Sequence, residues 1–425
     1  MGLNYIKEDE KVNEKIILYR KSSKIVEEDD RCKQLQVQEN KNPENAYMFQ
    51  DYEYNNREWQ KEHILFDKKE YIFCSFKNTK FGRKAVLDED KMYCTNSSFW
   101  DVTFENCTFE NIYFDACYFW NCTFKNCRFS EYKTIFNNCC LKHLSMIQEE
   151  SGFATKYGST EFINCDMTSV EWRNCLGDRM IFEGNTFMDV SFRQCEMPDV
   201  IMKDDRFYST YFNNCDIRNL CIIGIRNADL EFHFTDKSKD INMHKKIYIG
   251  KIDEQFMKEK DEFEAASKMY YTLLDYLGMK NIDTEYMSEY RYCYNYFSMR
   301  GKQWWQQVWD RFSWLVCGYG EKLGRFVVTF LLTIIIPAIG YLFCGIKVGD
   351  KTIRYPLIDG TEFSLINFVK DFGKCLHFSI VTFSTVGYGN IVPSGISYII
   401  SAIQILIGVL FVALFTSIML KKILR

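Results

Sequence analysis

The sequence predicts a multidomain membrane protein with three parts: a cytosolic coil of stacked short strands, an α-helical linker, and a C-terminal domain built on two transmembrane helices. Three patterns lead to this prediction. Large apolar residues recur every five residues in the first half, an apolar heptad follows them, and two long charge-free stretches lie near the C-terminus. A period of five fits neither a helix nor a single strand, whose side chains repeat about every 3.6 and 2 residues.

Composition limits what the chain can be. Its 425 residues are 47% hydrophobic and carry a net charge of -4, so a large core is possible but the basic surface for nucleic-acid binding is missing. Residues 1–60 form a charged region without an apolar leader, and we expect the N-terminus to stay in the cytosol. The eighteen cysteines then lie largely in a reducing compartment, which disfavours disulfides. No nucleic-acid partner is expected.

The five-residue period runs through residues 61–232, and of the thirteen positions in its longest frame only Gly177 is not large and apolar. With two inward side chains and a turn in each unit, the chain can wind into a square coil whose rungs stack as parallel strands. The repeat centres are Phe66, Tyr71, Phe76, Phe81, then Phe99, Phe104, Phe109, Phe114, Phe119, Phe124, Phe129, then Phe136, Leu141, and finally Phe162, Met167, Trp172, Gly177, Phe182, Phe187, Phe192, Met197, Met202, Phe207, Phe212, Ile217 and Ile222.

Two further positions of the repeat have a preferred chemistry. Cysteine often lies two residues before the centre, where a buried thiol acts as a small hydrophobe, so we expect core packing and no metal site. Asparagine often directly precedes this cysteine position. It suits a corner of the coil, because asparagine tolerates turn dihedrals. The cysteines are Cys74, Cys107, Cys117, Cys122, Cys127, Cys139, Cys165, Cys175, Cys195 and Cys215, and the asparagines are Asn106, Asn121, Asn126, Asn164, Asn174 and Asn214.

With these features the segment resembles a pentapeptide-repeat domain, the right-handed quadrilateral β-helix. The resemblance implies four pentapeptides in each coil. The frame is lost at 83–92 and in an insertion at about 142–159. Loops are expected there, either as plain surface or as contact sites for a cytosolic ligand or partner protein.

A helical linker is predicted at 240–300. Phe256, Phe263, Tyr270 and Leu277 recur every seven residues, which is typical of an amphipathic helix, and a tyrosine-rich helical stretch follows. Residues 302–320 then place Trp304, Trp305, Trp309 and Trp314 before the first apolar stretch. Because tryptophan favours the headgroup level of a bilayer, we expect an interfacial helix there.

The two charge-free stretches, 326–346 and 396–420, are long enough to cross a bilayer. Buried helices of a soluble core are the alternative, but such helices are seldom apolar all round over this length. Lys322 and Arg325 precede the first stretch, and Lys421 and Lys422 follow the second. The positive-inside rule therefore predicts a multi-pass protein of the cell membrane with both termini in the cytoplasm.

Gly-Tyr-Gly occurs twice, and its neighbours distinguish the copies. The copy at Gly318 lies on the cytoplasmic side without a preceding helix and is predicted to be a turn. The other copy belongs to "TVGYG", follows a short apolar helix predicted at 372–383, and lies between the spans. Its glycines permit the positive φ that turns successive carbonyl oxygens toward one axis, where they can replace the water around potassium.

The order of span, short helix, filter and span resembles the two-span potassium channel pore over residues 325–425. The resemblance implies a homotetramer embedded in lipid, with potassium ions in the pore as the only metal and no other cofactor. The filter would consist of Thr385, Val386, Gly387, Tyr388 and Gly389, supported by Thr382, Ser384 and Asn390, with a gating hinge at Gly408. The sequence departs from the family pattern at Asn390, at Val381 and at the pair His377 and Phe378. These departures bear on the stability and inactivation of the filter more than on its selectivity.

We therefore expect a potassium channel gated from its N-terminal domain by a cytosolic ligand or partner, so that deletion of residues 1–240 changes its open probability. Neither span carries the periodic arginine or lysine of a voltage sensor. A membrane-anchored scaffold that mimics DNA and has a non-conducting pore is the alternative, although Lys125, Arg128, Arg173 and Arg193 interrupt any acidic face. No enzyme motif appears. A role in depolarising the membrane under stress stays open.

Overall fold

The computed structural model describes residues 4–423 apart from 29–47, 51–52, 56–57, 60–67, 83–91, 111, 130–133, 149–159, 178, 235–246, 253, 280–285, 350, 356–364 and 388. The chain divides into two compact units, one of Gly2–Trp304 and one of Trp305–Arg425. The first contains the repeats and the second contains both apolar stretches. Each is described by itself.

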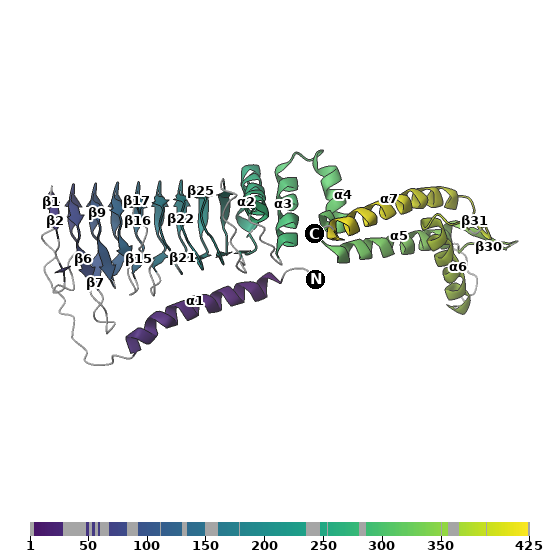
Figure 1. The fold of residues 1–425 in the computed structure, drawn as a ribbon. Helices are drawn as coiled ribbons and strands as arrows, with labels where there is room; N and C mark the ends of the chain where they lie inside the picture. Colours follow the sequence, from purple (N-terminus) through teal and green to yellow (C-terminus); the bar gives the residue numbers. More distant parts are fainter. Residues whose placement is uncertain are drawn as a thin grey trace. The chain divides into compact units, whose positions relative to one another are not determined.

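Parallel strands stack in four columns to form a solenoid in the first unit (Figure 1). The first column is β1 (Met48–Gln50), β4 (Glu70–Ile72), β8 (Ser98–Trp100), β12 (Tyr118–Trp120), β16 (Cys140–Lys142), β19 (Asp166–Thr168), β22 (Thr186–Met188) and β25 (Arg206–Asn213). The second is β2 (Glu53–Asn55), β5 (Ser75–Lys77), β9 (Thr103–Glu105), β13 (Thr123–Lys125), β17 (Ser145–Ile147), β20 (Glu171–Arg173) and β23 (Ser191–Arg193), and it ends on β25, which also pairs with β27 (Asn227–His233).

The third column is β3 (Glu58–Trp59), β6 (Lys80–Gly82), β10 (Thr108–Glu110) and β14 (Arg128–Phe129), followed by single bridges that join Leu176, Glu196 and Asp216. The fourth is β7 (Met92–Thr95), β11 (Ile112–Asp115), β15 (Ile135–Asn137), β18 (Glu161–Ile163), β21 (Ile181–Glu183), β24 (Ile201–Lys203), β26 (Cys221–Ile223) and β28 (Tyr248–Ile249). The predicted quadrilateral solenoid is confirmed.

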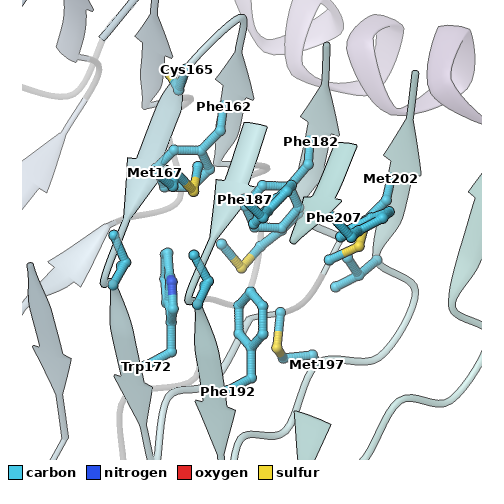
Figure 2. Packing of buried hydrophobic residues seen from close by; sticks show 14 of the residues in the cluster. Phe162, Cys165, Met167, Trp172, Phe182, Phe187, Phe192, Met197, Met202 and Phe207 are labelled. Atoms are coloured by element: carbon cyan, nitrogen blue, oxygen red, sulfur yellow. The ribbon is translucent and has the colours of Figure 1, made fainter. Parts of the chain in front are cut away.

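Repeat centres stack directly on one another inside the solenoid. Phe99 pairs with Phe119 and Phe104 pairs with Phe124, so one coil takes twenty residues, or four pentapeptides. Both ring pairs are stacked with centroids 4.6 Å apart. Figure 2 shows the same arrangement further along, where Phe162, Phe182 and Met202 point into the interior. The five-residue period therefore arises because every unit contributes one large side chain to a shared core.

The asparagine and cysteine positions have the local roles expected of them. All six named asparagines adopt the left-handed conformation, with φ between 50° and 56°. Most of the named cysteines are buried, and most of their thiols reach a backbone carbonyl in the coil before their own, as from Cys122 Sγ to the oxygen of Phe99 at 3.4 Å. Burial raises the pKa of the Cys122 thiol to about 12, so this sulfur stays protonated.

The solenoid is longer than the predicted 61–232, since its strands run from Met48 to Ile249. Its first coil follows the same period through Phe49, Tyr54 and Trp59, whose strands pair with those of Tyr71, Phe76 and Phe81. The predicted insertion at 142–159 also begins too early, because Met146 is a centre that pairs with Phe124 and Trp172. Residues 149–159, 83–91 and Phe66 lie outside the described residues.

Helices cover one side and one end of the solenoid. Helix α1 (Tyr5–Glu28) lies along the fourth column, where Val12 and Ile16 are buried (Figure 1). The charged region predicted at 1–60 thus contains a docked helix and the first coil. The linker prediction of two helices is matched by α2 (Lys260–Met279) and α3 (Met287–Gly301), which follow the short helix η2 (Glu254–Phe256).

Helix α2 packs on β27 and closes the end of the core. Thr272 Oγ1 accepts a hydrogen bond from the Phe232 amide at 3.1 Å, and the Tyr276 hydroxyl donates to the Cys215 carbonyl at 3.3 Å. Helix α3 packs on α2, and its buried Tyr290 donates to the Ile247 carbonyl at 2.8 Å. These bonds satisfy backbone groups at the last described coil.

The second unit holds α4 (Gln307–Cys317), η3 (Gly318–Gly320), α5 (Leu323–Cys344), β29 (Ile346–Val348), β30 (Lys351–Ile353), α6 (Leu365–Phe383), β31 (Ile391–Pro393) and α7 (Ser397–Ile423). Helices α5 and α7 are long and apolar enough to cross a membrane and expose most of their apolar side chains. The soluble-core alternative therefore does not fit. Helix α6 begins at Leu365, ahead of the predicted 372, because the polar residues at its start, including Lys370 and Asp371, hid its first turns.

Candidate functional site

The TVGYG motif begins directly at the C-terminal end of α6. The Ser384 amide donates to the Ile380 carbonyl at 2.9 Å, and the Thr385 amide donates to the Thr382 carbonyl at 3.1 Å. The Val386 amide reaches the Val381 carbonyl at 3.2 Å. These bonds cap the last turn of α6 and fix where the motif leaves the helix. The carboxyl end of α6 carries the negative end of the helix dipole.

Left-handed backbone alternates along the motif. Gly387 and Gly389 have φ of 61° and 76°, in the left-handed region that glycine permits. Thr385 also has a positive φ, 59°, which is uncommon for a β-branched residue and was not anticipated from the sequence. Changing the sign of φ at every second residue lets successive carbonyl groups point to one side of the strand. Val386, between Thr385 and Gly387, is 57% exposed in the single chain.

A small sheet holds the far end of the motif. Strand β31 follows Asn390 and pairs antiparallel with β29, so that Ile391 is opposite Val348 and Pro393 is opposite Ile346. Strand β29 also pairs with β30. The motif is therefore anchored by α6 at its start and by the sheet at its end. This sheet was not predicted, because its strands have only three residues each, too few to show an alternating pattern.

The other predicted site residues lie as follows. Thr382 is buried and accepts the Thr385 amide bond through its carbonyl, and the Ser384 hydroxyl donates to the Val381 carbonyl at 3.1 Å. Asn390 is exposed beside β31, and Tyr388 lies outside the described residues. Phe378, one of the residues that depart from the family pattern, faces α5. Its ring packs edge-on against that of Tyr341, with the ring centroids 4.8 Å apart.

Gly408 has a packing role in this structure. Helix α7 passes through it without a break, and a Cβ atom built there would collide with the Phe383 carbonyl oxygen. The absence of a side chain thus lets α7 approach the last residue of α6. Sequence reasoning missed this contact and a buried polar cluster around Gln404, for which Gln404 in α7 and Pro337 in α5 were the visible signals.

The Gly-Tyr-Gly copy at Gly318 lies at the end of a helix. Gly318 terminates α4 in the left-handed conformation, with φ 54° and ψ 48°, and its amide bonds back to Ser313 and Trp314. Helix α5 starts soon afterwards, at Leu323. The prediction of a turn at this copy is confirmed.

Comparison with known proteins covers both units. Residues 352–425 match the ion channel family, a segment that contains α6, the TVGYG motif and α7. No curated protein matches the chain. Two of the solved structures that match are full-length QnrB1, a plasmid-mediated fluoroquinolone resistance protein, and HetL, a pentapeptide repeat protein involved in heterocyst differentiation regulation from the cyanobacterium Nostoc sp. strain PCC 7120.

QnrB1 is 11% identical, with 42% of this chain and 92% of that chain covered and a TM-score of 0.14. HetL is 7% identical, with 43% of this chain and 90% of that chain covered and a TM-score of 0.13. The repeat assignment itself follows from the twenty-residue register of the coils in this chain. The protein joins an N-terminal pentapeptide-repeat β-solenoid to a C-terminal unit with two apolar helices long enough to span a membrane, and residues 352–425 of that unit form an ion channel domain.

Proposed function

We propose that the protein is a potassium-selective channel that assembles as a homotetramer. The observation that supports this most is the alternation of positive φ at Thr385, Gly387 and Gly389, at the carboxyl end of α6 and inside the ion channel domain. Four copies of such a strand around one axis would present rings of carbonyl oxygens that replace the hydration shell of potassium. Val386, Tyr388 and the Thr385 hydroxyl complete the proposed filter.

The electrostatics of a single chain agree with a cation pathway. The carboxyl end of α6, with its partial negative charge, lies at the start of the filter, so four such ends would favour a cation in the cavity below it. Potassium ions are the only cofactor that this mechanism uses. A homotetramer is required because one chain supplies a quarter of each oxygen ring.

For topology we infer two membrane spans with both termini in the cytoplasm. The flanking positive charges Lys322, Arg325, Lys421 and Lys422 support this orientation. The tryptophans before α5 then lie at the cytoplasmic surface of the bilayer, where Trp304 and Trp309, respectively 74% and 80% exposed in the chain, would contact headgroups.

Gating from the cytosolic side is the second part of the proposal. The solenoid, α1, α2 and α3 belong to one compact unit that ends at Trp304, directly before α4 in the sequence. A ligand or partner bound to this unit can therefore act on α5 through α4, and the inner helix would respond at Gly408. Opening the pore would move the membrane potential toward the equilibrium potential of potassium.

A DNA-mimicking scaffold is less well supported. Along the second column Lys77 and Lys125 both pair with Glu105, at 3.6 and 3.7 Å. Further along, Arg173 and Arg193 pair with Glu171 at 2.9 and 3.6 Å. Basic side chains thus alternate with acidic ones on this face, whereas a DNA mimic needs continuous negative charge.

Potassium flux into liposomes that contain the purified protein tests the proposal, with Gly387→Asp as the control. We expect flux in the wild type and none in the variant, because an aspartate side chain at a position with φ 61° disrupts the carbonyl ring. Equal flux in both proteins would exclude Gly387 from the pathway. If neither the full-length protein nor the protein that lacks residues 1–304 conducts potassium, the proposal is contradicted.

A further inference from the structure

A fully buried polar cluster joins the three helices of the ion channel domain behind the filter. Its side chains are Tyr341 of α5, Ser379 of α6 and Gln404 of α7, which are at most 1% exposed. The Tyr341 hydroxyl donates to Gln404 Oε1 at 2.7 Å, and Gln404 Nε2 donates to Ser379 Oγ at 2.7 Å. We call these three side chains the Gln404 cluster.

Two backbone carbonyls of α5 complete the cluster. Gln404 Nε2 also reaches the Thr333 carbonyl at 3.1 Å, and Ser379 Oγ donates to the Ile334 carbonyl at 2.6 Å. Pro337 lies four residues after Thr333 and has no amide hydrogen, so the Thr333 carbonyl has lost its usual helical partner. A freed carbonyl at membrane depth needs another donor, and the Gln404 amide provides it.

On both α6 and α7 the cluster lies one helical turn before the close contact between Gly408 and Phe383. Ser379 precedes Phe383 by four residues on α6, and Gln404 precedes Gly408 by four residues on α7. Residues four apart share a helix face. Gly408 contacts the Phe383 carbonyl, immediately before the filter turn. The same face of α7 is therefore fixed to α6 at two successive turns, by a polar contact and then by a close backbone approach.

We propose that Gln404 is a positioning residue for the filter. By fixing α6 between α5 and α7, its amide holds the carboxyl end of α6, and so the spacing of the carbonyl rings, at the distance that favours potassium over sodium. This inference rests on the proposed channel function. A role in helix packing alone would affect folding and assembly but not the ion selectivity of channels that had assembled.

The test measures the permeability ratio of potassium to sodium in bilayers for full-length variants that purify as tetramers. Gln404→Leu removes every hydrogen bond of the side-chain amide, including the one from Nε2 to the Ser379 carbonyl at 3.2 Å, and we expect the ratio to fall by roughly fivefold or more. Tyr341→Phe removes only the 2.7 Å bond to Gln404 and should lower the ratio by a smaller factor, about twofold. It is also the variant to use if Gln404→Leu does not assemble.

Ser401→Ala is the matched control, because Ser401 Oγ bonds only within α7, to the Tyr398 carbonyl at 2.9 Å, among the described residues. It should keep the wild-type ratio. An assembled Gln404→Leu or Tyr341→Phe channel with the wild-type ratio would overturn the inference while the channel function stands. A wild-type protein that does not select potassium would overturn the proposed function and this inference with it.

Discussion

At the scale of single residues, a buried column inside the solenoid contains one group that opposes stability. Cys165, Asn185 and Asp205 occupy equivalent positions in successive coils. Asn185 Oδ1 accepts from the Cys165 amide at 2.8 Å, and its Nδ2 donates to the Phe162 carbonyl at 3.0 Å. Asp205 Oδ1 accepts from the Asn185 amide at 2.7 Å, but its Oδ2 has no hydrogen-bond partner among the described residues. Burial raises the pKa of the Asp205 carboxyl well above its usual value.

Asp205→Asn should stabilise the protein at neutral pH. Below the unfolded pKa of about 4 both states hold the proton and the substitution changes little, whereas above it only the unfolded chain loses the proton and the wild type loses stability. We expect the apparent Tm to rise by roughly 3 °C at pH 7.5 and to differ little below pH 4. Scanning calorimetry would measure this, with Asp204→Asn at the adjacent half-buried corner as the control. A lower Tm at pH 7.5 would show that the charged form is stabilised by the fold.

At the scale of elements, α1 is held to the solenoid and to α3 by charged and polar pairs. Lys15 Nζ is 3.0 Å from Asp199 Oδ1, and the Arg20 guanidinium is 2.6 Å from Glu183 and 3.4 Å from Glu161. Tyr286, the residue that precedes α3, donates to Glu8 at 2.9 Å. Glu161 is only 1% exposed, so its carboxylate depends on the arginine for compensation of its charge.

Arg20→Ala should release α1, because it leaves the Glu161 carboxylate buried without its guanidinium, at a cost of about 2 kcal/mol or more. Hydrogen exchange over residues 5–28 is expected to accelerate while the solenoid strands keep their protection. Adding Glu161→Gln should restore part of the protection, since the buried charge is then gone. Unchanged exchange in the single variant would mean that the other contacts of α1, among them buried Val12 and Ile16 and the Lys15–Asp199 pair, keep it in place.

Which elements could be predicted depended on how strong their pattern is. Phenylalanines at intervals of five and two charge-free stretches led to the solenoid and the spans directly. Phe49, Tyr54 and Trp59 follow the same period, but the charged residues around them hid the first coil. Helix α1 has weak amphipathic character and is positioned by long-range ion pairs. Thr385, with its positive φ, lies in a motif that is held by α6 on one side and by the β29–β31 pairing on the other. Contacts of this kind are set by tertiary structure and leave no local sequence signal.

At the scale of the whole molecule, the boundary between the units determines where the channel can be cut to test gating. Deletion of residues 1–240 would leave α2 without the solenoid end to which Thr272 and Tyr276 are hydrogen-bonded. A cut before Trp305 follows the boundary between the two compact units. Residues 305–425 are expected to conduct potassium with an open probability different from that of the full chain, measured by single-channel recording. Identical gating in the two proteins would place the gate within the second unit.

If the TVGYG strands form a potassium-selective pore, the full-length protein should show it in its reversal potential in a planar bilayer, with equal concentrations of potassium on one side and sodium on the other. We expect a reversal potential displaced far from zero in the direction of potassium permeability, and loss of the current with Gly387→Asp. A current that reverses at zero would contradict it, because the pore would then pass both ions equally.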